Sequence, residues 1–192
     1  KGVVTKELMQ FLIALARQRG SSVIVDPKGP DFNKYAGVDY IKPNAKEFAQ
    51  MVTFFGLNPK NSLEENARSM IDALSLRGMI ITRGEHGISY VSKTEGMHLS
   101  AQARDVYDLT GAGDTVFAFL ALGLAQGLPM RECLMMANRA AAVAISHLKT
   151  YAVSLDELLD RSIELSEKIY DDWAQLKIEL DWLRADGKKV VI

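Results

Sequence analysis

Asp108-Leu-Thr-Gly-Ala-Gly-Asp114 is the most informative stretch of this 192-residue sequence. Its three small residues, Gly111, Ala112 and Gly113, stand where a strongly apolar helical segment begins. Small residues let backbone N–H groups approach an anion closely, and the partial positive charge of a helix N-terminus favours the same ligand. The stretch therefore predicts an anion-binding site at the start of a helix over residues 113–125.

Asp114 adds a carboxylate to the first turn of that predicted helix. A carboxylate beside a phosphate-binding turn is unfavourable for phosphate storage alone. It makes chemical sense if the carboxylate takes a proton from a hydroxyl group that attacks the phosphorus. An alternative fits the same residues: a tight strand-to-helix turn, with Asp114 interacting favourably with the helix dipole.

Outward from this stretch, strand-like and helix-like segments alternate along the chain. Strands separated by helices favour an α/β fold with a parallel sheet covered on both faces. The segment 113–125 is nearly all apolar, which predicts a helix buried on most sides. Leu8, Leu12 and Leu15 recur at helical spacing in the first helix. The expected helices span about 5–19, 44–55, 62–76, 113–125 and 129–147, and the expected strands 23–25, 40–41, 79–82 and 88–91.

Composition excludes several classes of protein. The sequence is 48% hydrophobic and 24% charged, which is typical of globular domains rather than disordered or fibrous chains. The net charge of −1 provides no field to attract nucleic acid or an anionic membrane. Apolar stretches end well short of the ~20 residues that a membrane helix needs. Cys133 is the only cysteine, which excludes an intrachain disulfide and favours a reducing, cytoplasmic location.

The Asp108–Asp114 stretch resembles the second signature of the ribokinase-like (PfkB) family of sugar kinases. The resemblance implies a three-layer ribokinase-like fold with a mostly parallel sheet flanked by helices. It also implies that Asp114 is the catalytic base and that the backbone amides of Gly111, Ala112 and Gly113 form an anion hole for the transferring phosphate. ATP and Mg²⁺ are the implied cofactors, and a sugar phosphate is the implied substrate.

A second motif of the family is similar to Pro43-Asn-Ala-Lys-Glu47. In the family this N-x-x-E motif helps to hold magnesium and the nucleotide phosphates, which assigns nucleotide binding to Asn44 and Glu47. Glu47 would act on the metal through water, because Mg²⁺ commonly keeps several waters. The same two residues also fit a capping box, in which Asn44 and Glu47 only stabilise a helix start.

Two further segments resemble nucleotide-contacting parts of the family. Thr82, Gly84 and Gly87 match a T-x-G-x-x-G turn beside the nucleotide, although many strand-turn-strand units look alike. Asn138 lies in a small-residue helix expected beside the adenine, and close helix packing would explain the same small residues. Lys149 stands where many relatives have a glycine.

Within the family, the sequence most resembles the heptose-7-phosphate kinase domains of bifunctional ADP-heptose synthases. The carrying residues are 25–32, 42–48, 150–154 and 183–192. The resemblance implies phosphorylation of D-glycero-β-D-manno-heptose 7-phosphate at its anomeric hydroxyl by ATP, in lipopolysaccharide-precursor synthesis. Two alternatives remain open: another ribokinase-like sugar or nucleoside kinase, and a non-catalytic nucleotide-binding fragment.

The same resemblance implies that the family's N-terminal half, with most sugar contacts, is absent from this sequence. Residues 1–164 would be the nucleotide-binding part of the kinase domain. Lys28 and Lys42 lie near the region for phosphate contact, but lysines on polar loops are usually solvated.

Residues 165–192 would be a helical linker toward a nucleotidyltransferase domain. A narrow apolar stripe runs along the expected 165–184 helix. The stripe would dock on a second catalytic domain or a second subunit, as in a homodimer, would pack on the kinase domain itself, or would belong to a free linker. It consists of Ile169, Trp173, Leu176, Leu180 and Leu183.

Overall fold

The strands form one five-stranded sheet whose order follows the chain, β1-β2-β3-β4-β5. The computed structural model describes residues 3–102 and 108–159. Strand β1 pairs with β2 and β2 with β3 in parallel, whereas the β3–β4 and β4–β5 pairs are antiparallel. The strands are β1 (Ile24–Val25), β2 (Tyr40–Ile41), β3 (Gly78–Thr82), β4 (Ile88–Ser92) and β5 (Gly96–Leu99).

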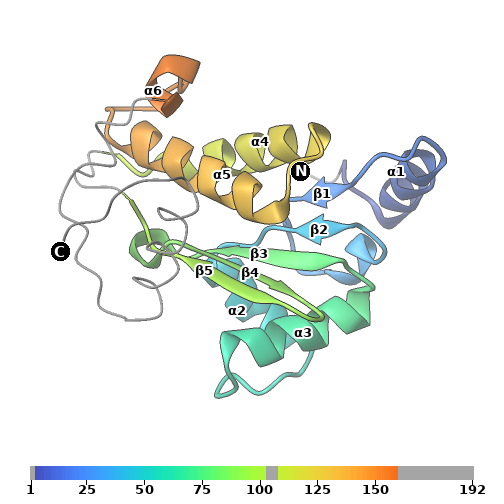
Figure 1. Ribbon diagram of the computed structural model, residues 1–192. Helices are drawn as coiled ribbons and strands as arrows, with labels where there is room; N and C mark the ends of the chain where they lie inside the picture. The colour runs from blue at the N-terminus through green and yellow to red at the C-terminus, as the bar shows by residue number, and fades with distance from the viewer. Residues whose placement is uncertain (1–2, 103–107, 160–192) are drawn as a thin grey trace. The chain divides into compact units, whose positions relative to one another are not determined.

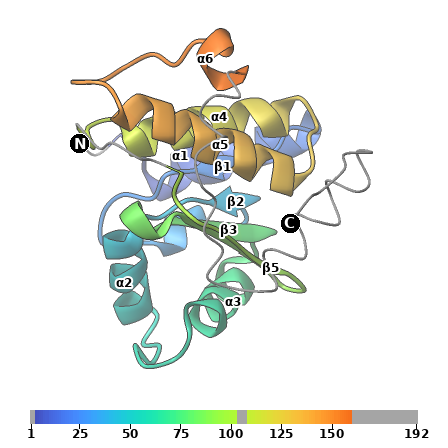
Figure 2. The same cartoon turned by 60° about the vertical axis from the view of Figure 1, so that its left-hand side comes forward.

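Helices cover both faces of this sheet (Figure 1; Figure 2). Two buried clusters fill the spaces between the layers, one on the side of α2 and α3 and the other on the side of α4 and α5. The expected α/β layers are therefore confirmed. The helices are α1 (Lys6–Gln18), α2 (Ala45–Phe54), α3 (Leu63–Leu74), α4 (Ala112–Ala125), α5 (Met130–Ile145) and α6 (Leu155–Leu159), with short 3₁₀ turns η1 (Asn33–Tyr35) and η2 (Gly84–His86).

The described sheet is mixed, where the alternation of strands and helices favours parallel pairing. The cause is the short connection between β3 and β4, which consists of η2 and its flanking residues. A connection of this length can join only antiparallel neighbours, because a parallel crossover needs a dozen or more residues.

Side-chain caps begin the first three helices where the sequence predicts them. The Thr5 hydroxyl accepts a hydrogen bond from the Leu8 amide at 3.2 Å. Capping boxes begin α2 at Asn44 and α3 at Ser62. Each cap satisfies amide groups that a helix start would otherwise leave without partners.

Two helices bury different faces from those that the sequence suggests. Helix α1 buries Met9 and Ile13, while Leu12 is exposed, because a leucine-rich helix offers more than one apolar face. Helix α4 buries Val116, Leu120 and Gly123 but exposes Leu122. The prediction that α4 is buried on most sides is wrong for the described residues, since its described packing is chiefly against α5 and the sheet.

Apart from Leu159, the last residue of α6, the described secondary structure lies in a compact unit that ends at Leu158. The predicted boundary at residue 164 and the apolar stripe of the 165–184 helix lie outside the described residues. Among the helices that the structure does describe, none has the length and apolar composition needed to cross a bilayer.

Candidate active site

The carboxyl ends of the three parallel strands lie side by side and bring polar residues together. Asp26 directly follows β1 and Lys42 directly follows β2. Beyond Lys42, Asn44 forms an isolated parallel bridge with Thr82, the last residue of β3. The Thr82 amide donates to the carbonyl of Pro43 at 3.1 Å. Ligands of open α/β sheets bind at this edge, so the topology places a candidate site here.

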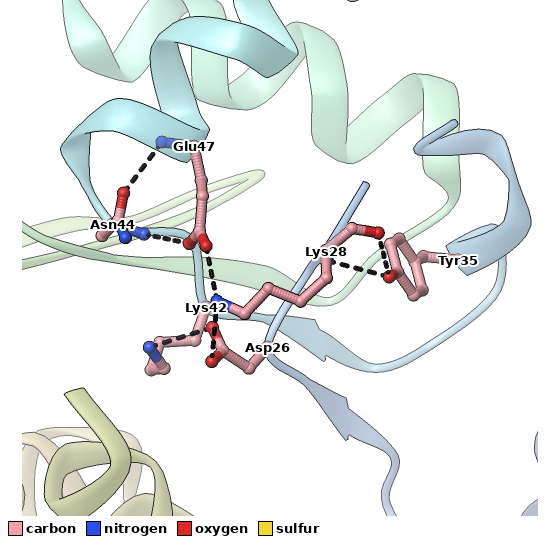
Figure 3. A network of polar contacts seen from close by, with 6 residues as sticks. All are labelled: Asp26, Lys28, Tyr35, Lys42, Asn44 and Glu47. Atoms are coloured by element: carbon pink, nitrogen blue, oxygen red, sulfur yellow. Dashed lines mark hydrogen bonds and ion pairs between the residues drawn. The ribbon is translucent and has the colours of Figure 1, made fainter. Parts of the chain in front are cut away.

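Asn44 and Glu47 form a complete capping box at the start of α2. The Glu47 amide donates to Asn44 Oδ1 at 2.8 Å, and the Asn44 amide donates to Glu47 Oε2 at 2.9 Å. This contact uses one carboxylate oxygen and leaves the other, Oε1, facing the strand ends (Figure 3). Glu47 can therefore cap the helix and still present a charged oxygen to a ligand, so the two interpretations of the motif are compatible.

Four charged side chains form a continuous network at the strand ends (Figure 3). The Lys28 ammonium lies 2.5 Å from Glu47 Oε1 and 3.3 Å from Asp26 Oδ2. The Lys42 ammonium lies 3.1 Å from Asp26 Oδ1, a buried oxygen with no hydrogen bond of good geometry. Partial burial acts to lower the pKa of Lys28, but its hydrogen bond with Glu47 and the charge of Asp26 outweigh burial, so the pKa is raised.

Lys42 is the member of this network whose burial the sequence analysis did not predict. It is 2% exposed, whereas a lysine next to a polar loop is expected to be solvated. Its position between β2 and Pro43 draws the stem into the structure, and Asp26 balances its charge. A lysine and an aspartate directly after neighbouring parallel strands are the signal that would have found this pair.

The N-terminus of α4 is open. Gly111 precedes the helix with φ 83° in the left-handed region, and no side chain caps the first turn. A Cβ atom added at Gly113 would have only Lys42 Nζ near it, at 4.0 Å. The buried Lys42 ammonium is therefore close to the open helix end, which places a positive charge beside amide groups that favour anions.

Asp114 and Asp108 have different roles in the stretch that they enclose. Asp114 is exposed and makes no hydrogen bond or ion pair with any other residue in the described part of the chain. Asp108 Oδ1 accepts from the Thr110 amide at 2.8 Å, and Oδ2 accepts from the Lys149 amide at 3.2 Å. These hydrogen bonds, with Thr110 foremost, hold the pKa of Asp108 below its usual value. Asp108 shapes the turn, whereas Asp114 is available to a substrate.

The turn after β3 depends on its two glycines in different ways. Gly84 has φ 59° and open space around it, so its conformation alone favours glycine. At Gly87 an added Cβ would lie 2.0 Å from the carbonyl oxygen of Leu99 and 2.7 Å from the Ala101 amide. Gly87 therefore permits the close approach of this turn to the chain after β5.

Asn138 lies on α5 and is buried, with 5% of its surface exposed. Its side-chain amide donates to the carbonyl of Ser100 at 2.8 Å, which ties the segment after β5 to the helix. Asn138 therefore has a structural role in the described fold. This contact draws Asn138 to the β5 side of the fold rather than to the network around Asp26.

Residues 1–157 match the family model for pfkB family carbohydrate kinases. The chain belongs to this family. The pfkB match covers both the open start of α4 and the strand ends that carry Asn44 and Thr82, and carbohydrate kinases are phosphotransferases. Kinases of this family use ATP, and the structure of Arabidopsis thaliana ribokinase complexed with ribose and ATP is among the similar structures, at TM-score 0.67 and 23% identity over 76% of this chain and 48% of that one.

Other comparisons agree on the fold and on the family. Ribokinase from Thermotoga maritima matches with TM-score 0.70 and 22% identity, over 84% of this chain and 61% of that one. The bifunctional protein HldE of Syntrophotalea carbinolica is 38% identical over the whole chain. The chain spans about 40% of the length of that relative. The ribokinase-like fold is thus confirmed.

The residues at the strand ends fit the magnesium that the family implies. Mg²⁺ keeps several waters and is commonly bound through one or two carboxylates plus substrate phosphates. Glu47 Oε1 and Asp26 Oδ2 face each other across the Lys28 ammonium and could hold a hydrated cation. In the described ranges, no cluster of three or more His, Cys, Asp or Glu side chains would enclose a metal without such waters.

Proposed function

We propose that this chain is the nucleotide-binding part of an ATP-dependent kinase whose substrate is D-glycero-β-D-manno-heptose 7-phosphate. The kinase would phosphorylate this sugar at its anomeric hydroxyl. The observation that carries the proposal is the 38% identity over the whole chain to a bifunctional HldE protein. The sequence motifs and the lipopolysaccharide-precursor role that they imply agree with it.

In this proposal Asp114 is the catalytic base. The anomeric hydroxyl attacks the γ-phosphorus of ATP, its proton passes to the Asp114 carboxylate, and the bond between the γ-phosphorus and the bridging oxygen breaks to release ADP. Asp114 suits this role because it is exposed and makes no contact with another described residue that would occupy its oxygens. A free carboxylate can accept a proton without first breaking an internal hydrogen bond.

The open end of α4 stabilises the charge that develops on the transferred phosphate. The amides of Gly111, Ala112 and Gly113 supply the donors, although that of Ala112 also donates to the carbonyl of Leu109 at 3.3 Å, and Lys42 adds a positive charge beside them. Preorganised donors and cations at the developing charge are the main source of catalysis in phosphoryl transfer.

The strand ends hold the nucleotide and its metal. Glu47 would hold magnesium through water, and Asn44, Thr82, Gly84 and Gly87 would line the path of the nucleotide. Magnesium, when bound, neutralises the charge of the phosphate oxygens. Asn138 supports the adenine side indirectly, by holding the segment at Ser100.

The test is an ADP-release assay with the natural full-length protein and ATP. We expect turnover with D-glycero-β-D-manno-heptose 7-phosphate and little with ribose, fructose 6-phosphate or a nucleoside. The product, identified by phosphorus NMR, is expected to carry its new phosphate on the anomeric oxygen. Faster turnover of another acceptor than of the heptose phosphate would contradict the proposed substrate.

A further inference from the structure

The Lys28 ammonium occupies the position between two carboxylates where a hydrated metal would lie. It contacts one oxygen of Glu47 at 2.5 Å and one oxygen of Asp26 at 3.3 Å (Figure 3). A single cation shared by oxygens from two carboxylates has the arrangement that a divalent cation with its waters would also adopt. The side chain is therefore an internal cation at this site.

The backbone of Lys28 is anchored while its side chain is not. The Lys28 amide donates to the hydroxyl of Tyr35 at 2.9 Å, and that hydroxyl donates to the Lys28 carbonyl at 2.9 Å. Tyr35 is buried, so the anchor is part of the core. The Lys28 side chain is 66% exposed. The ammonium can thus leave its partners while the loop keeps its place.

Space for that movement lies next to the network. A pocket of about 270 Å³ is lined by Lys28 and Glu47 together with Phe32 and Gln50. The long, flexible stem of a lysine can follow the apolar wall of such a pocket and keep its charged end in water.

Charge balance makes it unfavourable for the Lys28 ammonium and a divalent cation to occupy the carboxylate pair at the same time. Asp26 and Glu47 balance Lys28 and Lys42, so the network is formally neutral. A divalent cation beside Glu47 would repel an ammonium on the same oxygens at short range. Lys42 is buried and remains on Asp26 Oδ1, which leaves Lys28 as the group that must move.

We propose that Lys28 and the divalent cation occupy the Asp26–Glu47 pair in turn, so that Lys28 acts as a built-in counter-ion that the metal displaces. The inference rests on the proposed function, which assigns the metal to Glu47. Lys28 balances the two carboxylates before the metal arrives and sets a threshold for metal binding.

The test measures Mn²⁺ binding to the intact protein without nucleotide, by the loss of the free-ion signal in electron paramagnetic resonance. Lys28→Met is expected to tighten Mn²⁺ binding about fivefold, the size of effect that losing the ion pairs of a largely exposed lysine gives. Lys28→Arg keeps the charge and is expected to bind Mn²⁺ about as the unaltered protein does.

Lys46→Met is the matched control. Lys46 is exposed, lines the same pocket and makes no ion pair with any residue of 3–102 or 108–159. The substitution Lys46→Met removes one positive charge near the pocket, as Lys28→Met does, but keeps the ion pairs of Lys28 with Asp26 and Glu47. If it tightens Mn²⁺ binding as much as Lys28→Met does, the effect is one of general charge and the proposed exchange is wrong.

Thermal melting supplies a second readout. Lys28→Met is expected to melt earlier than the unaltered protein without metal, because Asp26 and Glu47 then repel each other. Added Mn²⁺ is expected to raise the melting temperature of Lys28→Met more than that of the unaltered protein. Equal shifts in both proteins would overturn the exchange.

Glu47→Gln separates this inference from the proposed function. Glutamine keeps the capping box, so the helix start remains. If Glu47→Gln weakens Mn²⁺ binding while Lys28→Met leaves it unchanged or weaker, the metal site stands and the exchange is wrong. If Glu47→Gln has no effect on Mn²⁺ binding, the metal assignment of the proposed function is wrong and the exchange is overturned with it.

Discussion

The first turn of α2 is closed by two side chains, whereas the first turn of α4 is open. Asn44 and Glu47 satisfy amides at the start of α2 with hydrogen bonds of 2.8 and 2.9 Å. At α4 a left-handed Gly111 precedes the helix and no side chain takes the place of a cap. Both helix ends lie near the charged network at the strand ends, which includes the buried Lys42. Their location in the fold therefore does not explain why one end is capped and the other is not.

The contrast shows how one fold divides stability and ligand binding between two helix ends. A capped end has its donors satisfied and contributes stability. An uncapped end forgoes that stability and keeps its donors for an anion. Glu47 joins the two regions, because one of its oxygens caps α2 while the other faces the strand ends.

The strongest test of the open end is Asp114→Asn. We expect turnover in the full-length protein to fall by a factor on the order of 10²–10⁴, because asparagine cannot accept the hydroxyl proton. ATP affinity and the melting temperature are expected to stay near their original values, since Asp114 is exposed and has no partner among the described residues. Activity within a few-fold of the original would refute its role as base.

Two single substitutions, one at Gly113 and one at Gly111, separate the effect on nucleotide binding from the effect on folding at the open end of α4. Gly113→Val is expected to weaken ATP binding on the order of tenfold, because its side chain projects where the phosphate approaches the amides. The melting temperature should change little, since an added Cβ would meet only Lys42 Nζ, at an ordinary contact distance of 4.0 Å.

Gly111→Val is the contrasting variant. Gly111 has φ 83°, and an added Cβ would lie 3.2 Å from Thr150 Cγ2. We expect this variant to lose about 1–2 kcal/mol of stability, measured by denaturant unfolding. If Gly113→Val leaves the ATP affinity unchanged, the assignment of the anion hole to this helix end is wrong.

Asn44→Ala removes the cap of the closed end, and Ser62→Ala removes the equivalent cap of α3. Each is expected to cost about 1 kcal/mol of unfolding free energy, because both begin a complete capping box. Only Asn44→Ala is expected also to weaken binding of magnesium–ATP, measured by calorimetry. Equal effects of the two changes on nucleotide binding would leave Asn44 with a structural role alone.

Lys149→Gly tests the loop that borders the open end. Lys149 has φ 68°, and its amide donates to Asp108, which shapes the turn before α4. Glycine adopts this conformation without the clash of a Cβ atom, so we expect stability to rise by about 1 kcal/mol. Lys149→Ala keeps the Cβ atom and serves as the control. A fall in the melting temperature of Lys149→Gly would contradict the strain argument.

The smallest expected effect is the pH response of a third capping box, between Ser154 and Glu157 at the start of α6. Hydrogen bonds from Ser154, then from Tyr151, and the charge of His147 lower the pKa of Glu157 to about 2. A carboxyl whose pKa is lower in the folded state stabilises above its unfolded value of about 4.5, and this contribution is lost as pH falls toward 2. Melting curves of Glu157→Gln should lack that component. An identical pH profile between pH 5 and 2 would refute it.

Much of the fold follows from local patterns. Strand β2 spans the two residues that the sequence predicts, and α2 begins one residue after the expected cap at Asn44. Short-range signals determine these features, because a cap or a turn involves residues three or four positions apart. The start of α4 belongs to the same class, since three small residues before an apolar run predict a helix from residue 113, and α4 begins at Ala112.

Only the tertiary structure brought Asp26, Lys28 and Lys42 into the candidate site. Asp26 and Lys28 stand on the loop after β1 and Lys42 on the segment after β2, and local sequence patterns do not give the distance between these two segments. They meet because β1 and β2 pair in parallel, which places both carboxyl ends at one edge of the sheet. The burial of Lys42 and the exposure of Leu122 on α4 also depend on which elements pack together.

The sequence by itself determined most of the elements, the helix starts and the motif residues, because each depends on residues close in the chain, but it did not predict strand β5. The tertiary structure decided which of Glu47's oxygens caps α2 and which faces a lysine, and it decided that Asp114 is free while Asp108 is not. These outcomes depend on contacts between residues far apart in the chain, such as the 19 positions that separate Lys28 from Glu47. Hydrophobic patterns and caps do not encode such distances; strand pairing does.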